Sequence, residues 1–567
     1  MEGVFLHGRN RSNRAQHALR MVLLTTTPVW AQTAPLQVNP LSQQAQDLQK
    51  QQQAPRVSAG SLQPSVTSWR VSTLPSEKPC FVVQKLVLEG PHVASFHFAQ
   101  RYLNRYAGRC VGEQGLRQIV ARVSDRILAE GYITTEVKLP QQNLSSGTLK
   151  LVVIPGILQG FKLAPDSAPL DWRSAFPLRP GDVLNLRALE QGLEQIKQIA
   201  SQDVHMNIEP GDQPGTSVVV LTAARTKPWR VTVGANNEGF KSTGRDQGSI
   251  SLAIDQPLRM NDALTLSVSH SLPLSNDEVG SRNWSLDERI PWGWWNVDAY
   301  ASSYGFFQQL LGGTQTFRSS GTAQTFGIRV SRVVHRTKNG RTTVQASIDG
   351  READNYIDGT AIAIQHRHTR SVSLGIAQRQ YMGAAQLDAS ITYQHGVPWF
   401  NGQWDPSTPN AQIPRFDYQL MLSDVALQWP LHWGTQTLSL SSALHWQYSP
   451  DRLYAEDYIG IGGPFTVRGF EGDDVLSAED GYYSRNQLTL PLSRSGVSLY
   501  TGWDYGRVWG PDFAYPRGHV VSGVFVGTQG AVTSHIQWDV SLGWPLIAPA
   551  WLPTSEALVK ASVQVSF

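Results

Sequence analysis

The amino-acid sequence predicts a transmembrane β-barrel of about 16 antiparallel strands, preceded by two small α+β domains. Three observations predict this fold. Residues 229–567 alternate apolar and polar side chains with a period of two, residues 80–228 repeat one α+β unit, and residues 1–31 have the features of a secretory leader.

The composition of the chain excludes some classes of protein. Charged residues make up 16% of the 567 residues, below the roughly 25% that is usual in soluble domains. The length indicates several domains, or one large barrel with appended domains. The formal net charge is +3 and neither sign dominates, so we expect no nucleic-acid partner.

Residues 1–31 are predicted to be a signal peptide. Four arginines precede an apolar run from Met21 to Trp30, and Val29 and Ala31 occupy the two positions that signal peptidase reads. The apolar run is shorter than the roughly 20 residues that a spanning helix needs. The alternative is a buried N-terminal helix.

Residues 32–79 are predicted to be a linker, because they are rich in glutamine, proline and serine. Leu41–Gln53 contains neither glycine nor proline and is compatible with a short polar helix. Its composition is equally compatible with disorder.

The two cysteines, Cys80 and Cys110, are predicted to form one disulfide, because an exported chain meets an oxidising compartment. Closing a loop of this length stabilises a domain by roughly 3–4 kcal/mol in the chain-entropy account. Two free buried thiols are the alternative.

Residues 80–157 and 158–228 are predicted to be the two α+β domains, each with the order strand, helix, strand, strand. Each helix has one apolar face, formed by Leu116, Ile119, Val120, Val123 and Ile127 in the first unit and by Leu186, Leu189, Leu193, Ile196 and Ile199 in the second. Neither unit contains a catalytic constellation.

Residues 229–567 are predicted to form the barrel. Apolar residues occupy every second position in strand after strand, as in Ile250, Leu252 and Ile254. One apolar face and one polar face suit a barrel with lipid outside and water inside, although a soluble sandwich alternates similarly. The segment's length, its alternation of short and long turns and the 18 tryptophans of the chain favour the membrane. Division by about 21 residues per strand and turn gives roughly 16 strands.

The last strand has one apolar face formed by Val559, Ala561, Val563, Val565 and the terminal Phe567. An amphipathic strand that ends on an aromatic residue looks like an outer-membrane assembly signal.

A loop of about 30 residues, longer than compact domains usually contain, is predicted between strands that end near Tyr448 and start near Tyr483. It contains the run Val467, Arg468, Gly469 and Phe470. The planar guanidinium of Arg468 suits a carboxylate. The motif is weak when taken alone.

The strand around Gly502–Gly506 offers that carboxylate. Its alternation places Asp504 on the polar face that would line the lumen, and flanking glycines leave room for an approaching loop. An ion pair between Arg468 and Asp504 inside the barrel follows as a hypothesis. Two unrelated solvated charges are the alternative.

These features together resemble the TpsB transporters of two-partner secretion, in the Omp85 superfamily. The resemblance spans roughly residues 80–567 and rests on the two α+β units, on Val467–Phe470 with Gly502–Gly506, and on the stretch from Tyr132 to Gly156. That branch has two POTRA domains before a 16-stranded barrel. Its substrates include haemagglutinins and haemolysins.

The resemblance implies roles for the chain and its residues. The POTRA units would lie in the periplasm and capture an unfolded partner, a TpsA-like adhesin, cytolysin or toxin, for passage through a barrel in the outer membrane. Arg468 and Asp504 would hold the long loop in the lumen, with Gly506 beside it, and a helix within residues 36–53 would plug the pore. The outer-membrane assembly machinery and the lipid bilayer complete the expected partners.

Other functions are less well supported by the sequence. It contains neither a Gly-x-Ser-x-Gly elbow nor a His-Glu-x-x-His helix, so we expect no enzyme, cofactor or metal site. His366 and His368 form a pair without a third ligand nearby in sequence. A barrel insertase or a porin with periplasmic binding domains remain the alternatives, and an insertase more typically has more POTRA units.

Overall fold

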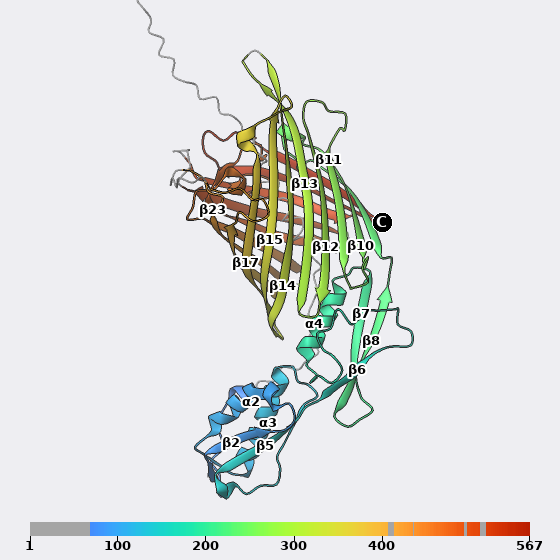
Figure 1. Ribbon diagram of the computed structural model, residues 1–567, viewed down its shortest axis with the longest axis vertical. Helices are drawn as coiled ribbons and strands as arrows, with labels where there is room; N and C mark the ends of the chain where they lie inside the picture. The colour runs from blue at the N-terminus through green and yellow to red at the C-terminus, as the bar shows by residue number, and fades with distance from the viewer. Residues whose placement is uncertain (1–67, 314, 406–412, 435, 493–495, 511–517) are drawn as a thin grey trace, which may run out of the picture.

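The computed structural model describes residues 68–313, 315–405, 413–434, 436–492, 496–510 and 518–567. The predicted signal peptide and the predicted plug at 36–53 therefore lie outside the described residues. Two small α+β units and a large barrel follow one another along the chain (Figure 1). Among the described residues, no helix is long and apolar enough to cross a membrane.

The first α+β unit is a three-stranded sheet covered by two helices. Its sheet has the order β2-β5-β4, with β2 parallel to β5 and β4 antiparallel to it. The elements are β1 (Phe81–Val83), β2 (Lys85–Glu89), α2 (His97–Leu103), β3 (Arg109–Val111), α3 (Glu113–Ala129), β4 (Glu136–Lys138) and β5 (Thr148–Ile154). The apolar face predicted for the helix is buried here, with Ile119, Val123 and Ile127 fully enclosed.

A disulfide and the preceding segment reinforce this unit. Cys80 and Cys110 are bonded across the short β1–β3 pair, with Cα atoms 5.3 Å apart. Glu77, within the predicted linker, accepts hydrogen bonds from the backbone N–H groups of Gln114 at 2.9 Å and Gly115 at 2.7 Å. These bonds to the helix N-terminus hold the pKa of Glu77 below its ordinary value. The end of the linker is thus part of the folded unit.

The second unit repeats the sheet, with the order β6-β8-β7. Its elements are β6 (Ile157–Leu163), α4 (Leu186–Lys197), β7 (Gln202–Pro210) and β8 (Thr216–Arg225). Ile157 opens β6 directly after Pro155 and Gly156. Residues 164–185, which follow the first strand of this unit as α2 follows β2 in the first, contain no helix.

Sixteen long strands of the described chain close into a barrel, which confirms the predicted fold class. They are β9 (Trp229–Asn236), β10 (Gln247–Asp255), β11 (Ala263–Ser271), β12 (Gly280–Trp292), β13 (Trp295–Leu311), β14 (Thr316–Thr337), β15 (Gly340–Ile357), β17 (Arg367–Met382), β18 (Ala385–Gly396), β19 (Gln419–Trp433), β20 (Gln436–Tyr448), β23 (Asp480–Leu492), β24 (Val497–Trp509), β25 (Val520–Ala531), β26 (Ile536–Ile547) and β27 (Leu558–Ser566). The two-residue β16 (Thr360–Ala361) extends only the tip of β15. Antiparallel pairing of β27 with β9 closes the barrel.

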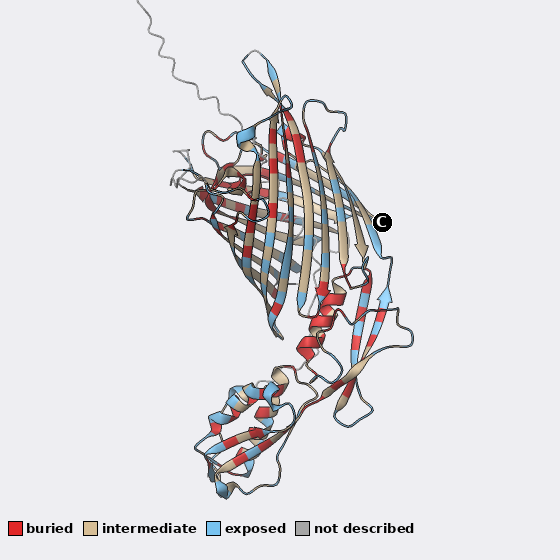
Figure 2. Cartoon of the chain, in the orientation of Figure 1, coloured by how far each residue is buried: buried red, intermediate tan, exposed pale blue. Residues whose placement is uncertain are grey.

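The predicted alternation sorts side chains between the two faces of the barrel wall. Leu374 and Ile376 of β17 are exposed on the outside, as Ile348 is on β15. Five exposed tryptophans lie towards the strand ends nearest the α+β units, namely Trp229, Trp292, Trp295, Trp429 and Trp433, whereas Trp284, Trp399, Trp404 and Trp503 lie elsewhere. The strand ends are the expected position of an interfacial aromatic girdle. Figure 2 shows the mixture of intermediate and exposed residues along the strands.

The loops at the two ends of the barrel differ in length. Tight turns at the end near the α+β units contain Gly383 and Gly434, both with positive φ, where a side chain would be strained. The opposite end has long connections, and β13 to β15 extend furthest there (Figure 1). The longest connection in the described residues carries β21 (Ile459–Ile461) and β22 (Leu476–Ala478), which pair as a small hairpin.

We expect loss of the disulfide to lower the free energy of unfolding of the first unit by about 3–4 kcal/mol, because the bond restricts the unfolded chain. The measurement is denaturant unfolding of a fragment of residues 68–156, which contains a hydrophobic core of its own, oxidised and reduced. The double variant Cys80→Ser, Cys110→Ser controls for effects of the reductant. Equal unfolding midpoints would contradict the expectation.

Candidate functional site

The long loop of residues 449–479, which we call the lumen loop, turns back against the inner wall of the barrel. Its hairpin packs with Val467 and Phe470 into a buried apolar cluster that also includes wall residues Val508 and Val521. A loop buried in this way must satisfy its polar groups within the protein. The structure shows how the predicted motif does so.

Arg468 is bonded to Asp504, the residue that the sequence hypothesis paired with it. Its Nε and Nη2 donate to the two carboxylate oxygens at 2.6 and 2.9 Å, and its backbone N–H donates at 3.0 Å. Asp504 is fully buried and also accepts from the backbone N–H of Asn486 at 3.0 Å. We call the Arg468–Asp504 pairing the lock.

Other wall residues complete the environment of Arg468. Its Nη1 donates to Gln487 Oε1 at 2.8 Å, and its guanidinium lies 3.6 Å from the centroid of the Phe525 ring. The guanidinium group thus has partners on β23, β24 and β25. Separating such a pair in a buried setting typically costs about 3–5 kcal/mol.

Glycines in the wall let the loop backbone lie directly on the strands. A Cβ atom at Gly523 would be 2.0 Å from the carbonyl oxygen of Arg468. Gly469 has φ of 101°, and a Cβ atom there would be 2.6 Å from the Trp544 carbonyl oxygen. At Gly506, a Cβ atom would approach Ile461 and Val467 to 3.0 Å. The strands β24 to β26 therefore form a bed that is shaped for this loop.

The tip of the lumen loop also contacts the extracellular connections next to the closing seam. Lys241 Nζ lies 2.5 Å from Glu471 Oε2, and Ser555 Oγ donates to Glu471 at 2.6 Å. The backbone N–H of Ser242 donates to Asp473 at 2.8 Å. The loop is thus fixed both to the wall and to neighbouring loops.

The second α+β unit docks on the opposite end of the barrel through a polar face of α4. Gln195 and Gln191 donate to the carbonyl oxygen of Gly293, in the β12–β13 turn, at 3.1 and 3.3 Å. Glu194 bonds Arg336 at 2.6 Å and also Arg341. Figure 2 shows α4 buried beneath the barrel. The sequence pattern indicated only the apolar face of α4 and gave no sign of the contacts that Gln191, Glu194 and Gln195 make with the barrel.

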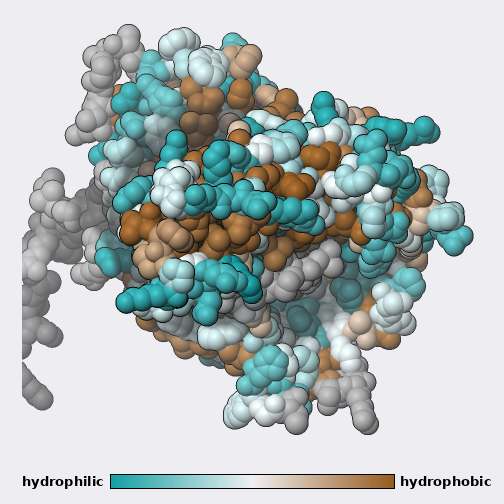
Figure 3. All heavy atoms as spheres, turned by 90° about the horizontal axis from the view of Figure 1, so that it is seen from below, coloured by the Kyte–Doolittle hydropathy of each residue, from teal (hydrophilic) through white to brown (hydrophobic). Residues whose placement is uncertain are grey.

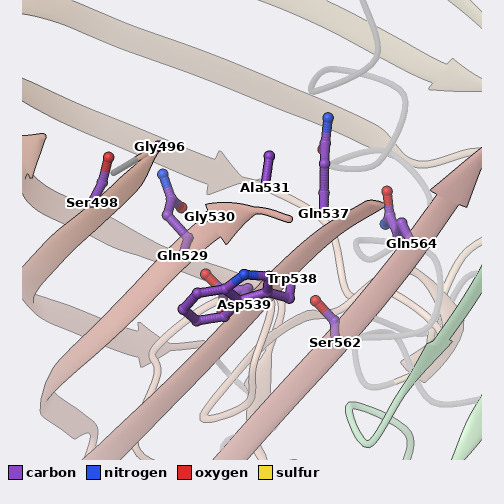
Figure 4. A pocket seen from close by; sticks show the side chains of 10 residues that line it. All are labelled: Gly496, Ser498, Gln529, Gly530, Ala531, Gln537, Trp538, Asp539, Ser562 and Gln564. Carbon is purple, nitrogen blue, oxygen red and sulfur yellow. The ribbon is translucent and has the colours of Figure 1, made fainter. Parts of the chain in front are cut away.

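The lumen between these two sites is lined by polar groups that largely satisfy one another. Arg289 pairs with Asp298 and Arg379 with Asp388, each at 2.6 Å. A pocket of about 360 Å³ lies where β24 to β27 approach the α+β units, and it is lined mostly by Ser498, Gln529, Gln537, Asp539, Ser562 and Gln564 (Figure 4).

The remaining predicted site residues are distant from the lock. Phe567 is exposed at the end of β27, and its backbone N–H donates to the Val231 carbonyl oxygen at 2.9 Å. His366 and His368 have rings 4.3 Å apart, and each faces a carboxylate, of Asp354 and Glu352 respectively. Within the described ranges, no cluster of three or more His, Cys, Asp or Glu could hold a metal ion.

Comparison with known proteins identifies the family. A model of the haemolysin secretion/activation proteins ShlB/FhaC/HecB matches residues 215–530. A model of the ShlB-type POTRA domain matches residues 81–156, and another POTRA model matches residues 157–210. The two α+β units are therefore POTRA domains.

Curated relatives agree along most of the chain. The outer membrane transporter CdiB-2 of Burkholderia pseudomallei is 37% identical over 93% of both chains. The hemolysin transporter protein ShlB of Serratia marcescens is 25% identical over 77% of both. The solved structure of CdiB from Escherichia coli matches with a TM-score of 0.80 and 27% identity, over 93% of this chain and 97% of that one.

These matches confirm the resemblance on which the sequence analysis relied and place the barrel in the outer membrane, with the POTRA domains in the periplasm. The chain belongs to the ShlB/FhaC/HecB haemolysin secretion/activation family, the TpsB branch of the Omp85 superfamily, and it is an outer-membrane transporter of two-partner secretion.

Proposed function

We propose that the POTRA domains capture an unfolded partner and pass it into the lumen, and that the lock keeps the lumen loop in the position that export requires. The observation that carries this proposal is the lumen loop, bonded through Arg468 inside a closed barrel. The partner is a large TpsA-like adhesin, cytolysin or toxin. Its folding outside the cell supplies the drive, and we propose no enzymatic activity, nucleotide or cofactor for this chain.

Capture is supported by the edges and surfaces of the POTRA domains. β4 is an edge strand of the first sheet and β7 is an edge strand of the second, so each can accept an added strand. The edge of β2 is covered by the side chain of Gln100, and the start of β6 is covered by residues 181–182. Exposed apolar side chains occur on the same domains, namely Val71, Phe81, Val82, Val93, Leu139 and Leu163. Apolar and hydrophilic groups are interspersed on the molecule as viewed from the POTRA end (Figure 3). An unfolded chain offers both backbone and apolar groups to such a surface.

The docking of α4 supports delivery from the POTRA domains to the barrel. Glu194 is held by two arginines whose strands, β14 and β15, end at the periplasmic mouth. A chain that is bound at the edge of the second sheet is therefore already close to the entrance. The paired charges of the lumen wall then favour passage over binding.

Further parts of the proposal concern assembly and the resting state. Residues 1–31 direct export of the transporter itself, and residues 36–53 plug the resting pore. The outward valines of β27 and the terminal Phe567 form the signal that the assembly machinery reads, which is supported by their exposure on the lipid face. Cys80 and Cys110 stabilise the first POTRA domain, and Gly506 gives the loop room.

We expect Arg468→Gln and Asp504→Asn each to reduce secretion of the genetically linked partner severely, because each variant leaves a buried charge without its partner. The measurement is the amount of partner in the culture medium. Arg379→Gln and Asp388→Asn are the controls, because they break another lumen ion pair in which the arginine Nε also lies 2.6 Å from a carboxylate oxygen, between two wall strands.

Heat-modifiable migration of the barrel on gels reports assembly in every variant. Undiminished secretion in both lock variants would refute the proposed role of the lock. Equal loss in the lock and control variants would also refute it, because any lumen charge would then have the same effect. Deletion of residues 80–227 should abolish secretion, and export without them would refute capture by the POTRA domains.

We expect Gly523→Val to displace the lumen loop without any change of charge, because its side chain would occupy the position of the Arg468 backbone. The measurement is protease cleavage within residues 462–475 on intact cells, which should increase together with loss of secretion. Gly248→Ala is the control, because a Cβ atom there meets nothing closer than 3.4 Å. Cleavage at the wild-type rate would contradict this expectation.

A further inference from the structure

The lumen loop has a second attachment, to strands on the side away from the lock. Arg351 of β15 donates from Nη1 to the carbonyl oxygen of Glu456 at 2.8 Å and lies 3.7 Å from Asp457 Oδ1. Arg367 of β17 places Nε 3.8 Å from Glu456 Oε1. We call these four residues the outer clasp. Both arginines alternate with the outward apolar residues of their strands, so both belong to the lumen face.

Aromatic stacking adds a neighbouring extracellular loop to this attachment. The Arg367 guanidinium lies 4.5 Å from the Tyr454 ring centroid, and that ring stacks on Phe416 with centroids 4.5 Å apart. Phe416 belongs to the connection between β18 and β19. The first limb of the lumen loop, residues 452–458, is therefore held by two wall strands and by one adjacent loop.

The outer clasp is bonded less completely than the lock. Glu456 is only 7% exposed, yet neither of its carboxylate oxygens accepts a hydrogen bond from the described residues. Arg367 Nε likewise donates none within the described part of the chain. Asp504 is also buried, but it accepts hydrogen bonds from the guanidinium group and backbone N–H of Arg468 and from the backbone N–H of Asn486. Buried charges without hydrogen bonds are costly, so the clasp is the weaker attachment.

The two attachments lie far apart around the barrel. The outer clasp is on β15 and β17, whereas the bed of the loop tip is on β24, β25 and β26. The order of neighbouring strands between them is β15-β17-β18-β19-β20-β23-β24-β25-β26. This series spans eight of the sixteen strand-to-strand steps. The lumen loop is consequently attached along half of the extracellular rim, by the outer clasp at one end and by the lock at the other. Near the clasp, Leu453 is buried against Tyr418 and Leu420, so the polar clasp is the part of this end that is poorly bonded.

We propose that Arg351 and Arg367 are positioning residues of the transporter, which hold the first limb of the lumen loop against β15 and β17 and release it so that the exit widens on that side. The lock keeps the loop tip in place meanwhile. This inference rests on the proposed export function and adds to it the part of the loop that moves. The unequal bonding of the two attachments decides which of them opens first.

The test is the ion conductance of the purified full-length transporter in planar lipid bilayers, which requires no partner protein. The double variant Arg351→Gln, Arg367→Gln should shift the channel towards larger and longer openings than wild type shows. Arg289→Gln is the matched control and should leave conductance unchanged, because this lumen arginine pairs with Asp298 on the adjacent wall strand.

Charge reversal separates positioning from a general structural role. Arg367→Glu alone should enlarge the openings, and adding Glu456→Arg should return them to the wild-type size. If the variants of Arg351 and Arg367 fail to assemble, the double variant Glu456→Gln, Asp457→Asn removes the loop carboxylates of the clasp and leaves β15 and β17 unchanged. It should enlarge the openings in the same way. Wild-type conductance in heat-modifiable clasp variants would overturn the inference. Larger channel openings in the clasp variants would support the inference even if the partner were not secreted. Conductance therefore tests the clasp, and secretion tests the export proposal, independently of each other.

Discussion

In the core of a bilayer no water is present to bond backbone amides, so the sheet of this protein has to close upon itself. Pairing of Ser562–Ser566 with Thr232–Asn236 supplies that closure and joins strands more than 300 residues apart. The rest of the architecture depends on it. Once the barrel is closed, its alternating side chains separate into a lipid face and a lumen face, and the lumen becomes a polar compartment with an entrance and an exit.

A loop that enters such a compartment loses water from its own backbone, and the wall has to replace that water. Glycines supply the space, because Gly523 lets the Arg468 carbonyl approach the strand, and the carboxylate of Asp504 supplies the acceptor. The loop motif around Arg468 therefore works only together with the wall strands that carry Asp504 and Gly523. The guanidinium group of Arg468 donates its hydrogen bonds in a fixed planar geometry. Glycines, which lack a side chain, let the loop backbone come close enough to the wall for those hydrogen bonds to form.

The lumen loop and α4 are held to the barrel by attachments that differ in the hydrogen bonds they make. The lock is saturated with hydrogen bonds, whereas the outer clasp leaves the Glu456 carboxylate buried without donors. At the periplasmic end, Glu194 of α4 is held by two arginines of the barrel. Conformational change in proteins usually begins at regions of low local stability. The poor bonding of the outer clasp therefore indicates that the first limb of the lumen loop is a region of low local stability.

The sequence by itself determined the barrel, the two POTRA units and the pairing of Arg468 with Asp504, because each is encoded by local periodicity or by a short motif. It did not reveal α2, the attachment of Glu77 to α3 or the docking of Gln195. The outer clasp was equally hidden, since Arg351 and Glu456 are 105 residues apart and each alone looks like a solvated charge. Alternation along a strand tells which face a side chain occupies. Only closure of the sheet decides what that side chain meets across the lumen, because the partner comes from a strand or loop whose position depends on every register between them.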